Sequence, residues 1–346
     1  MSPEVQQLAK WCAQNGCGGH FGAAFAELTP IQNDAGFRRY FRVGGTRPLM
    51  AVLSPPATEN NRAFVSIAKF LASGGLRVPE VHASDFARGF LLLEDLGSDL
   101  MSQRVNSGNA DGIYAEVLNI LLLLQQCKPD PGIFPRYDRQ TLLRELRLFD
   151  EWFVTAELGV VLNAEEEQLL LQVYEDLLGS ALSQPQVVVH RDFHSRNLIY
   201  HGEKGFGLID FQDALIGPLS YDPVSLLKDC YLRWEPARVE AWALDYARQA
   251  RERGLLGADV ADEEFLRWFD CMGLQRHLKV LGIFCRLNKR DGKPAYRRHL
   301  PRVLQYVLEV LAKYPQLQAF SAWFAERLLP EIRRQPWMRE GAGAEA

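Results

Sequence analysis

The sequence predicts an α+β protein with a small, strand-rich amino-terminal lobe and a larger, mostly helical carboxy-terminal lobe. Short strand-like segments fill the first quarter of the chain, and helical periodicity dominates after Gly97. An island of short apolar strands interrupts the helices between residues 187 and 209. We therefore expect an N-lobe over residues 1–96 and a C-lobe over 97–340. The small, polar tail at 341–346 is expected to be disordered.

In the N-lobe, the apolar pattern predicts two helices and five short strands. Residues 5–12 and residues 64–71 carry apolar side chains at helical spacing, and two glycines at 74 and 75 end the second helix. A turn signal at 33–36 separates the first two strands. The strands are expected at 28–32, 38–43, 49–53, 81–83 and 90–93.

In the C-lobe, long helical patterns surround three short strands. The dipeptide Asp222-Pro223 indicates one further helix that starts at Pro223 with Asp222 as its N-cap, because Asp is a strong cap and Pro suits the first helical position. The strands are expected at 187–189, 198–200 and 206–209, and the longer helices at 110–127, 138–156, 164–182, 236–254, 262–289, 299–313 and 317–329.

Composition and charge exclude several classes of protein. The 346 residues are 47% apolar and 24% charged, as in ordinary globular proteins, and the net charge of -4 gives no reason to expect nucleic-acid binding. The start of the chain lacks a secretory signal pattern, and no apolar stretch approaches a membrane span of about 20 residues. Six scattered cysteines without a C-x-x-C pair indicate reduced thiols. We therefore expect a cytoplasmic protein with no membrane partner.

The strand island carries the strongest chemical signal. Its first strand leads into the pattern H-x-D-x-x-x-x-N, formed by His190, Asp192 and Asn197, and its last strand ends at Asp210-Phe211. Carboxylate and amide oxygens suit Mg²⁺, and phosphoryl transfer also needs a carboxylate that orients the acceptor hydroxyl and takes its proton. Asn197 and Asp210 can supply the metal ligands, and Asp192 can stand on the acceptor side. A buried acid that caps a loop would explain either motif alone, but not both together.

At these residues the chain resembles the kinase-like phosphotransferases, in the branch of the aminoglycoside phosphotransferases and choline kinases. The resemblance covers residues 28 to 311 and implies a protein-kinase-like two-lobe fold that uses ATP and Mg²⁺. It implies Asp192 as the catalytic base, Asn197 and Asp210 as metal ligands, and His190 as a brace of the catalytic loop. It also implies that main-chain groups of the segment between the lobes hold adenine, at Leu93, Glu94, Asp95 and Leu96. Taken alone, Leu91–Leu93 could equally be a plain buried strand.

The chain departs from the kinase pattern at the phosphate-binding lysine. The third strand reads Leu49-Met50-Ala51-Val52-Leu53 and has no lysine, yet a cation near the phosphates is still needed to offset their charge. We expect an arginine of the preceding strand to take this role, with Arg38 or Arg42 ahead of Arg39. A solvated basic edge strand is the competing interpretation.

The acceptor is expected to be neutral or anionic. Residues 276–302 contain nine basic residues and one acid, a segment that either faces solvent or lines the acceptor pocket. In a pocket it would repel a polycation such as an aminoglycoside and favour a carboxylate or phosphate. The candidate substrate-binding residues are Arg196, Asp213, Gln275 and Lys279.

Several longer motifs look like those of the anomeric sugar kinases of bacterial cell-wall (peptidoglycan) recycling. They lie at 34–42, 91–97, 275–284 and 290–293. The resemblance implies phosphorylation of N-acetylmuramic acid and N-acetylglucosamine at the C1 hydroxyl, with a uridylyltransferase using the product. Two alternatives stay open: a kinase of an aminoglycoside, choline or another small alcohol, and a non-catalytic, nucleotide-binding pseudokinase. The sequence does not indicate an oligomeric state.

Overall fold

The computed structural model describes residues 2–17, 25–31 and 36–341. Its contacts divide the chain into two compact units. The first comprises Met1–Ile113, Gly132–Phe134 and Arg196–Ala214, and the second comprises Tyr114–Pro131, Pro135–Ser195 and Leu215–Ala346. This grouping of contacts is not the same division as the lobes expected from the sequence, whose boundary after residue 96 stays a prediction. Residues 33–35 of the expected turn and 342–346 of the expected tail lie outside the described residues.

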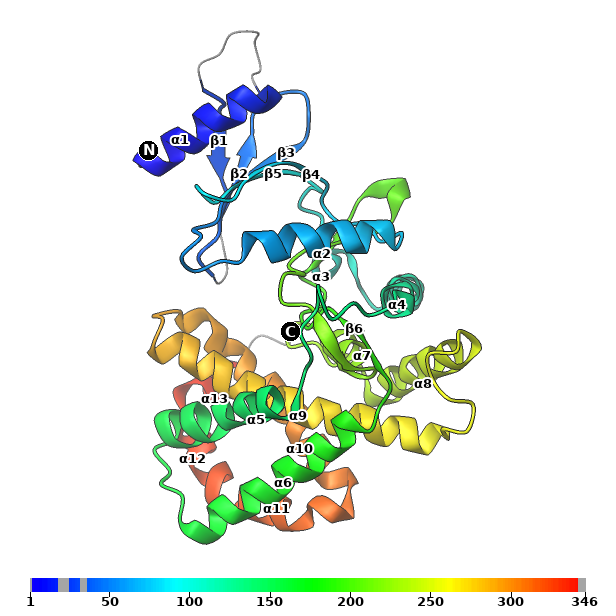
Figure 1. The fold of residues 1–346 in the computed structure, drawn as a ribbon. Coiled ribbons are helices and arrows are strands. Elements are labelled where there is room, and N and C mark those ends of the chain that lie inside the picture. The colour runs from blue at the N-terminus through cyan, green and yellow to red at the C-terminus, as the bar shows by residue number, and fades with distance from the viewer. Residues whose placement is uncertain (1, 18–24, 32–35, 342–346) are drawn as a thin grey trace. The chain divides into compact units, whose positions relative to one another are not determined.

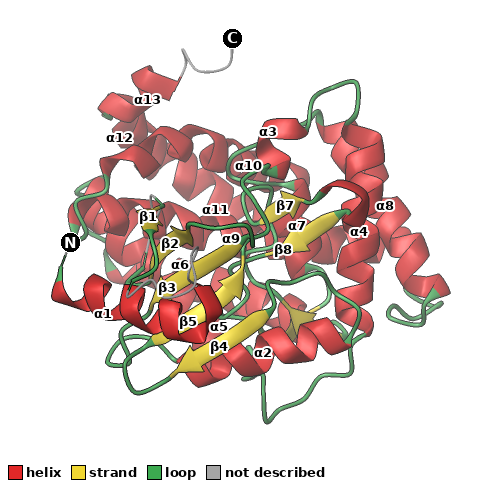
Figure 2. Ribbon diagram, turned by 90° about the horizontal axis from the view of Figure 1, so that it is seen from above, coloured by secondary structure: helices red, strands yellow, loops and turns green. Residues whose placement is uncertain are grey.

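The first unit contains a five-stranded antiparallel sheet (Figure 2). In spatial order the strands are β1 (Leu28–Pro30), β2 (Arg39–Val43), β3 (Leu49–Leu53), β5 (Phe90–Glu94) and β4 (Val81–Asp85). The helices α1 (Pro3–Cys12) and α2 (Asn61–Ser73) lie on opposite faces of this sheet (Figure 1). All five strands and both helices expected in this part of the chain are therefore confirmed.

Alternation of side chains gives the two faces of the sheet different roles. Phe41 of β2 and Ala51 of β3 are buried with Leu8 and Trp11 of α1 in one apolar cluster. Successive strand residues point to opposite faces, so Tyr40 and neighbouring even-numbered residues of β2 belong to the face that α2 covers. Both faces are thus packed by a helix, and the α2 face also carries the polar side chain of Tyr40.

A separate two-stranded hairpin in the first unit joins β7 (Leu198–Tyr200) to β8 (Phe206–Leu208). The hairpin is attached on both sides within the unit. The N–H of Leu208 donates to the carbonyl of Arg77 at 2.8 Å, and the N–H of Tyr200 donates to that of Asp99 at 2.8 Å. Next to it is the short helix α3 (Met101–Arg104). Both strands of the hairpin were expected from the sequence.

The second unit is built around the long helix α9 (Asp262–Lys289), which packs against several other helices. A Cβ atom at Gly282 would lie 2.2 Å from the carbonyl oxygen of Leu148, so glycine permits a close approach there. Most expected helices are confirmed within a few residues. The helices from α4 on are α4 (Ala110–Gln126), α5 (Arg139–Leu148), α6 (Ala164–Leu182), α7 (Tyr221–Leu227), α8 (Pro236–Glu252), α9, α10 (Leu300–Lys313), α11 (Gln318–Trp323), α12 (Leu329–Arg334) and α13 (Pro336–Gly341).

Three details differ from expectation. The helix expected at 138–156 continues from α5 as a π-helical stretch over Phe149–Glu157, and that at 317–329 is split by another at Phe324–Leu328. The strand β6 (Gln186–Val189) pairs with a strand not predicted, β9 (Leu215–Pro218). The helix expected to start at Pro223 starts at Tyr221. Within the described ranges, no helix has the length and apolar character that a membrane crossing requires.

Candidate active site

Asn197 and Asp210 lie at the same end of the β7–β8 hairpin. The register pairs Leu198 with Leu208, and the N–H of Ile209 donates to the carbonyl of Asn197 at 3.1 Å. Asn197 is buried, whereas Asp210 is exposed. Asp210 adopts a positive φ of 63°, and its Oδ1 accepts a hydrogen bond of 2.7 Å from Gln212. We call residues 197–210 the acid hairpin. An amide and a carboxylate oxygen side by side suit Mg²⁺, which takes few protein ligands and fills its shell with phosphate oxygens and water.

A buried arginine belongs to the same unit as the acid hairpin. The Arg38 guanidinium lies 2.9 Å from the Glu59 carboxylate, donates to Ser54 Oγ at 3.2 Å, and lies 5.2 Å from the ring centre of Phe64. Phe64 in turn stacks on Phe211, with centroids 5.0 Å apart. Arg38 and the residue that follows Asp210 therefore contact the same aromatic ring.

The charges of Arg38 and Asp210 both act on Tyr40. Burial raises the pKa of Tyr40 to about 12, with Asp210 and Glu59 adding to the rise and Arg38 opposing it. Arg39, by contrast, is exposed and pairs with Glu4 at 2.7 Å. Of the arginines at 38 and 39, Arg38 is therefore the buried one, with its charge offset by Glu59, and its role toward phosphate stays a prediction.

The segment expected to hold adenine has two of its main-chain donors occupied. The N–H of Glu94 donates to the Glu80 carbonyl and that of Asp95 to the Pro48 carbonyl, both at 2.9 Å. The side chains of both residues are also engaged. Glu94 pairs with Arg77, and Asp95 pairs with Arg42 at 2.8 Å. Leu93 and Leu96 are buried. Adenine would therefore have to use other main-chain groups of residues 93–96.

The loop that carries Asp192 is tied at both ends by buried carboxylates. Asp222 accepts the N–H of His190 at 2.6 Å and that of Arg191 at 3.1 Å. At the other end, Asp229 Oδ2 accepts the N–H of Ser195 at 3.1 Å and its hydroxyl at 2.5 Å. We call residues 190–195 the catalytic loop.

The role expected for Asp222 is wrong in one respect. Asp222 is not the N-cap of α7, because it lies within the helix. The helix starts at Tyr221, and Ser220 is in the N-cap position. Its carboxylate instead holds the main chain of the catalytic loop. His190 is buried and packs edge-on against Phe193 with centroids 5.8 Å apart, a position that fits a structural brace.

An ionic cluster surrounds the start of the catalytic loop. Glu145 of α5 pairs with Arg191 and, at 3.0 Å, with Lys279 of α9, and it accepts a hydrogen bond from Tyr137. Arg191 has a positive φ of 74°, a conformation that side chains other than glycine rarely adopt, so its anchored guanidinium and N–H hold a strained residue.

The surrounding charges favour the ionised form of Asp192. Burial would raise the pKa of this carboxyl, but the basic side chains of His194, Lys279, Arg276 and Arg191 together lower it below its ordinary value. Asp192 is therefore a carboxylate at neutral pH, as a proton acceptor must be.

Glu145 and Asp229 were missed in the sequence, and only Glu145 left a signal there. Glu145 lies between Leu142 and Leu146 on the buried face of α5, and all three side chains are buried. An acid on an apolar stripe indicates a buried partner. Asp229 follows the apolar end of α7, and an acid in a loop at that position does not by itself indicate a buried hydrogen-bond partner.

The four expected substrate-binding residues fall in different units. Arg196 and Asp213 belong to the first, whereas Gln275 and Lys279 are buried on α9 in the second. Their roles stay predictions. The basic segment at 276–302 is not simply a solvated face, because Arg276 is only 4% exposed and Lys279 8% exposed.

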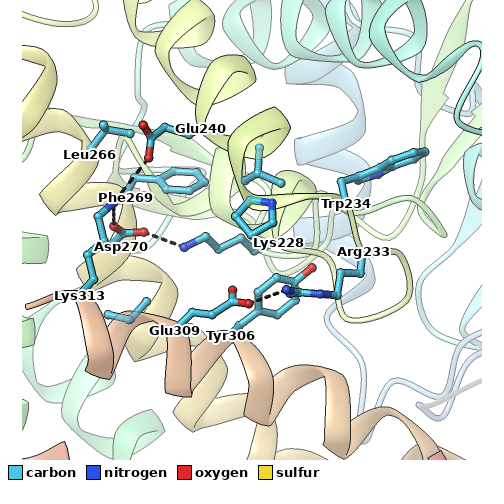
Figure 3. Close-up of a pocket in the computed structure, with 13 residues that line it drawn as sticks. Lys228, Arg233, Trp234, Glu240, Leu266, Phe269, Asp270, Tyr306, Glu309 and Lys313 are labelled. Carbon is cyan, nitrogen blue, oxygen red and sulfur yellow. Dashed lines mark hydrogen bonds and ion pairs between the residues drawn. The ribbon is translucent and has the colours of Figure 1, made fainter. Parts of the chain in front are cut away.

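A cavity of about 270 Å³ lies in the second unit (Figure 3). None of the residues discussed above as catalytic, metal-binding or nucleotide-binding lines it. Its acids and bases pair with one another: Asp270 lies 2.7 Å from Lys228 and 2.8 Å from Lys313, and Arg233 pairs with Glu309. We assign it no role in the chemistry.

Comparisons with known proteins agree with the site. The profile of a phosphotransferase enzyme family matches residues 27–269. The chain is 43% identical over 300 residues to an N-acetylmuramate/N-acetylglucosamine kinase of Pseudomonas putida, covering 86% of this chain and 88% of that protein. A protein of the same name from Neisseria meningitidis is 40% identical over 306 residues, covering 87% and 90%.

The fold has solved counterparts. Aminoglycoside phosphotransferase APH(2'')-Ib in its ADP-bound form superposes with a TM-score of 0.56 at 16% identity, covering 82% of this chain and 94% of that one. At that identity the likeness concerns the fold alone. It agrees with the small antiparallel sheet and the mostly helical remainder described above. The chain belongs to the phosphotransferase enzyme family and has a protein-kinase-like, two-lobe α+β fold.

Proposed function

We propose that this enzyme transfers the γ-phosphate of ATP to the C1 hydroxyl of N-acetylmuramic acid and N-acetylglucosamine. The two sugars are supported by the names of relatives that are 40–43% identical to this chain over most of its length. The observation that carries the chemistry is the position of Asp192 in a loop tied at both ends by Asp222 and Asp229, where neighbouring basic side chains lower the pKa of its carboxyl group. A binding module without catalysis has no use for such an acceptor-side base.

In this proposal each residue has a separate task. Asp192 accepts a hydrogen bond from the sugar hydroxyl, orients its oxygen for in-line attack and takes its proton as the new O–P bond forms and the bond between the γ-phosphorus and the bridging oxygen breaks, so that ADP leaves. Asn197 and Asp210 would hold Mg²⁺, whose charge would offset that of the phosphates. Arg38 compensates the phosphate charge that the metal leaves, in place of the missing lysine. Adenine is held by main-chain groups of residues 93–96 other than the N–H groups of Glu94 and Asp95.

The proposed product and the free cysteines suggest the next enzyme and the cellular compartment. A sugar 1-phosphate is a substrate for a nucleotidyltransferase, so we propose a uridylyltransferase as the next enzyme. The described cysteines Cys12, Cys127, Cys230, Cys271 and Cys285 are free thiols, which suits the cytoplasm.

A substrate panel tests the proposal. ADP release is measured by a coupled assay with N-acetylmuramic acid, N-acetylglucosamine, kanamycin and choline as acceptors, and phosphorus NMR identifies the position of the new ester. Turnover with both amino sugars and an anomeric phosphate are expected. Turnover with kanamycin or choline alone would reject the sugar assignment in favour of the alternative acceptors.

The same assay decides between an enzyme and a pseudokinase. Asp192→Asn is expected to lower turnover by about 10²–10⁴ while ATP affinity is kept, since general-base help is of that size. Asp259→Asn, in an exposed loop, is the control and should leave turnover unchanged. Equal rates for wild type and Asp192→Asn would contradict the proposed role.

A further inference from the structure

A wall of half-buried rings starts at the catalytic loop. His194, two residues after Asp192, meets Tyr231 edge-on with centroids 5.3 Å apart, and Tyr231 meets His299 in the same way at 5.0 Å. All three rings keep part of their surface accessible, and all three belong to the second unit. We call His194, Tyr231 and His299 the ring wall. It extends from the proposed base toward the residues just before α10.

Tyr231 is fixed relative to the catalytic loop. Asp229 Oδ1 accepts the N–H of Tyr231 at 2.8 Å, while Oδ2 of the same carboxylate holds Ser195 of the loop. On the other side, Arg302 donates to the carbonyl of Tyr231 at 2.6 Å. One side chain therefore sets the position of both the loop and the ring wall, as a substrate-binding surface beside a catalytic group requires.

Positive charge gathers around the ring wall. Arg276 contacts Cys230 Sγ at 3.6 Å, Arg302 donates to the carbonyls of Cys230 and Tyr231, and Arg298 donates to His299 Nε2 at 3.2 Å. Within the described part of the chain, none of these three arginines forms an ion pair with a carboxylate. A guanidinium without a carboxylate partner near a partly buried surface favours binding of an anion.

We propose that the ring wall and Arg298 form the acceptor subsite, in which Arg298 binds the carboxylate of N-acetylmuramic acid. This inference rests on the proposed function. A pyranose presents apolar C–H groups that pack against aromatic rings, and most ligand sites combine such surfaces with a few placed polar groups. Arg298 is exposed, and its described partner is a ring nitrogen. A guanidinium matches a carboxylate with two parallel hydrogen bonds. N-acetylglucosamine has no carboxylate, so Arg298 distinguishes the two sugars.

Binding of the carboxylate by Arg298 predicts that a substitution at this position changes the preference of the enzyme between the two sugars. Arg298→Gln is expected to raise KM for N-acetylmuramic acid by about 10- to 150-fold, the equivalent of one charge-assisted hydrogen bond. KM for N-acetylglucosamine is expected to change less than about twofold, because that sugar lacks the charge. Arg333→Gln, which removes an exposed arginine on α12, is the matched control and should change neither value. An unchanged ratio of the two KM values in Arg298→Gln overturns the inference.

The ring wall is tested separately. Tyr231→Ala should raise KM for both sugars by about tenfold, the order expected for lost aromatic packing, while Tyr231→Phe keeps the ring and should stay within about twofold. Melting temperatures confirm that each variant folds. If wild type phosphorylates neither sugar, the proposed function fails, and calorimetric binding of N-acetylmuramic acid to wild type and Arg298→Gln decides the subsite. Equal affinities, or no binding to wild type, overturn it.

Discussion

The catalytic loop and the acid hairpin are held in place by different forces. In the loop, acidic side chains do the positioning: Asp222 and Asp229 bind its main chain, and Glu145 binds Arg191. In the hairpin, β7 pairs with β8 through the main chain. Phe211, the residue that follows the hairpin, stacks on Phe64. Two segments that supply oxygen-bearing side chains to one proposed reaction thus have unlike supports.

The difference has energetic consequences. A buried network of charges is sensitive to the loss of one partner, because the remaining charge is left without compensation in a low-dielectric environment. Main-chain pairing and ring packing do not change with protonation. We therefore expect single polar substitutions and pH to affect the loop, and changes of side-chain volume to affect the hairpin.

The largest expected effect is at Glu145. Glu145→Gln should lower the free energy of unfolding by about 3–5 kcal/mol, because Arg191 and Lys279 would be left as buried charges without their carboxylate. Glu175→Gln is the matched control, since Glu175 pairs with Arg139 at the surface and such pairs contribute about 0–1 kcal/mol. Urea denaturation measures both. Equal losses in the two variants would show that charge does not hold the loop.

Arg38 tests whether charge near the hairpin serves the ligand or the fold. Arg38→Ala should raise KM for ATP by about tenfold or more, the size of a lost charge-assisted hydrogen bond to phosphate, and Arg38→Lys should recover part of it. Arg39→Ala removes the exposed arginine next to Arg38, at the start of β2, and should leave KM unchanged. A large loss of stability in Arg38→Ala without a change in KM would make Arg38 a structural residue like Glu145.

The contacts that hold the hairpin and those that hold the catalytic loop also differ in how far they could be predicted from the sequence. The hairpin was predictable, since short apolar runs at 198–200 and 206–209 sit next to Asn197 and Asp210. The loop's motif was predictable too, but its supports were not. Asp222, Asp229 and Glu145 lie 32, 34 and 46 residues from their loop partners, and periodicity carries no signal for pairs so distant. Asp222 was identified as an important acid but with a local capping role, because Asp-Pro also fits a helix start.

A smaller effect, specific to the loop, is expected on changing pH. Burial raises the pKa of Asp222 from 3.8 to about 7, against the opposing hydrogen bonds from His190 and Arg191. Between these two values the folded chain keeps a proton on Asp222 that the unfolded chain has lost. The stability contributed by this group is therefore complete below about pH 4 and falls as pH rises to about 7.

A comparison of wild type with Asp222→Asn isolates the pH-dependent part of the stability that Asp222 contributes. Asparagine has no proton to lose, so the stability of wild type relative to the variant should fall by about 1.4 kcal/mol per pH unit from pH 5 to 7 and then level off. Unfolding free energies at each pH measure it. A difference that does not vary with pH would mean that Asp222 is already ionised at pH 5.

The smallest expected effect is the coupling between Phe64 and Phe211, which tests the other half of the comparison. In a double-mutant cycle of Phe64→Leu and Phe211→Leu, the interaction should be about 0.5–1.5 kcal/mol, the usual value for an aromatic pair beyond its buried area. Phe64→Leu with Phe320→Leu is the control, since Phe320 packs on Trp323 and Phe324 elsewhere, and these two changes should be additive. Because neither ring titrates, the coupling should be the same at pH 5 and pH 8, where the Asp222 term differs. A coupling near zero would mean that main-chain pairing alone holds the hairpin, and a coupling that changes with pH would mean that its support is electrostatic after all.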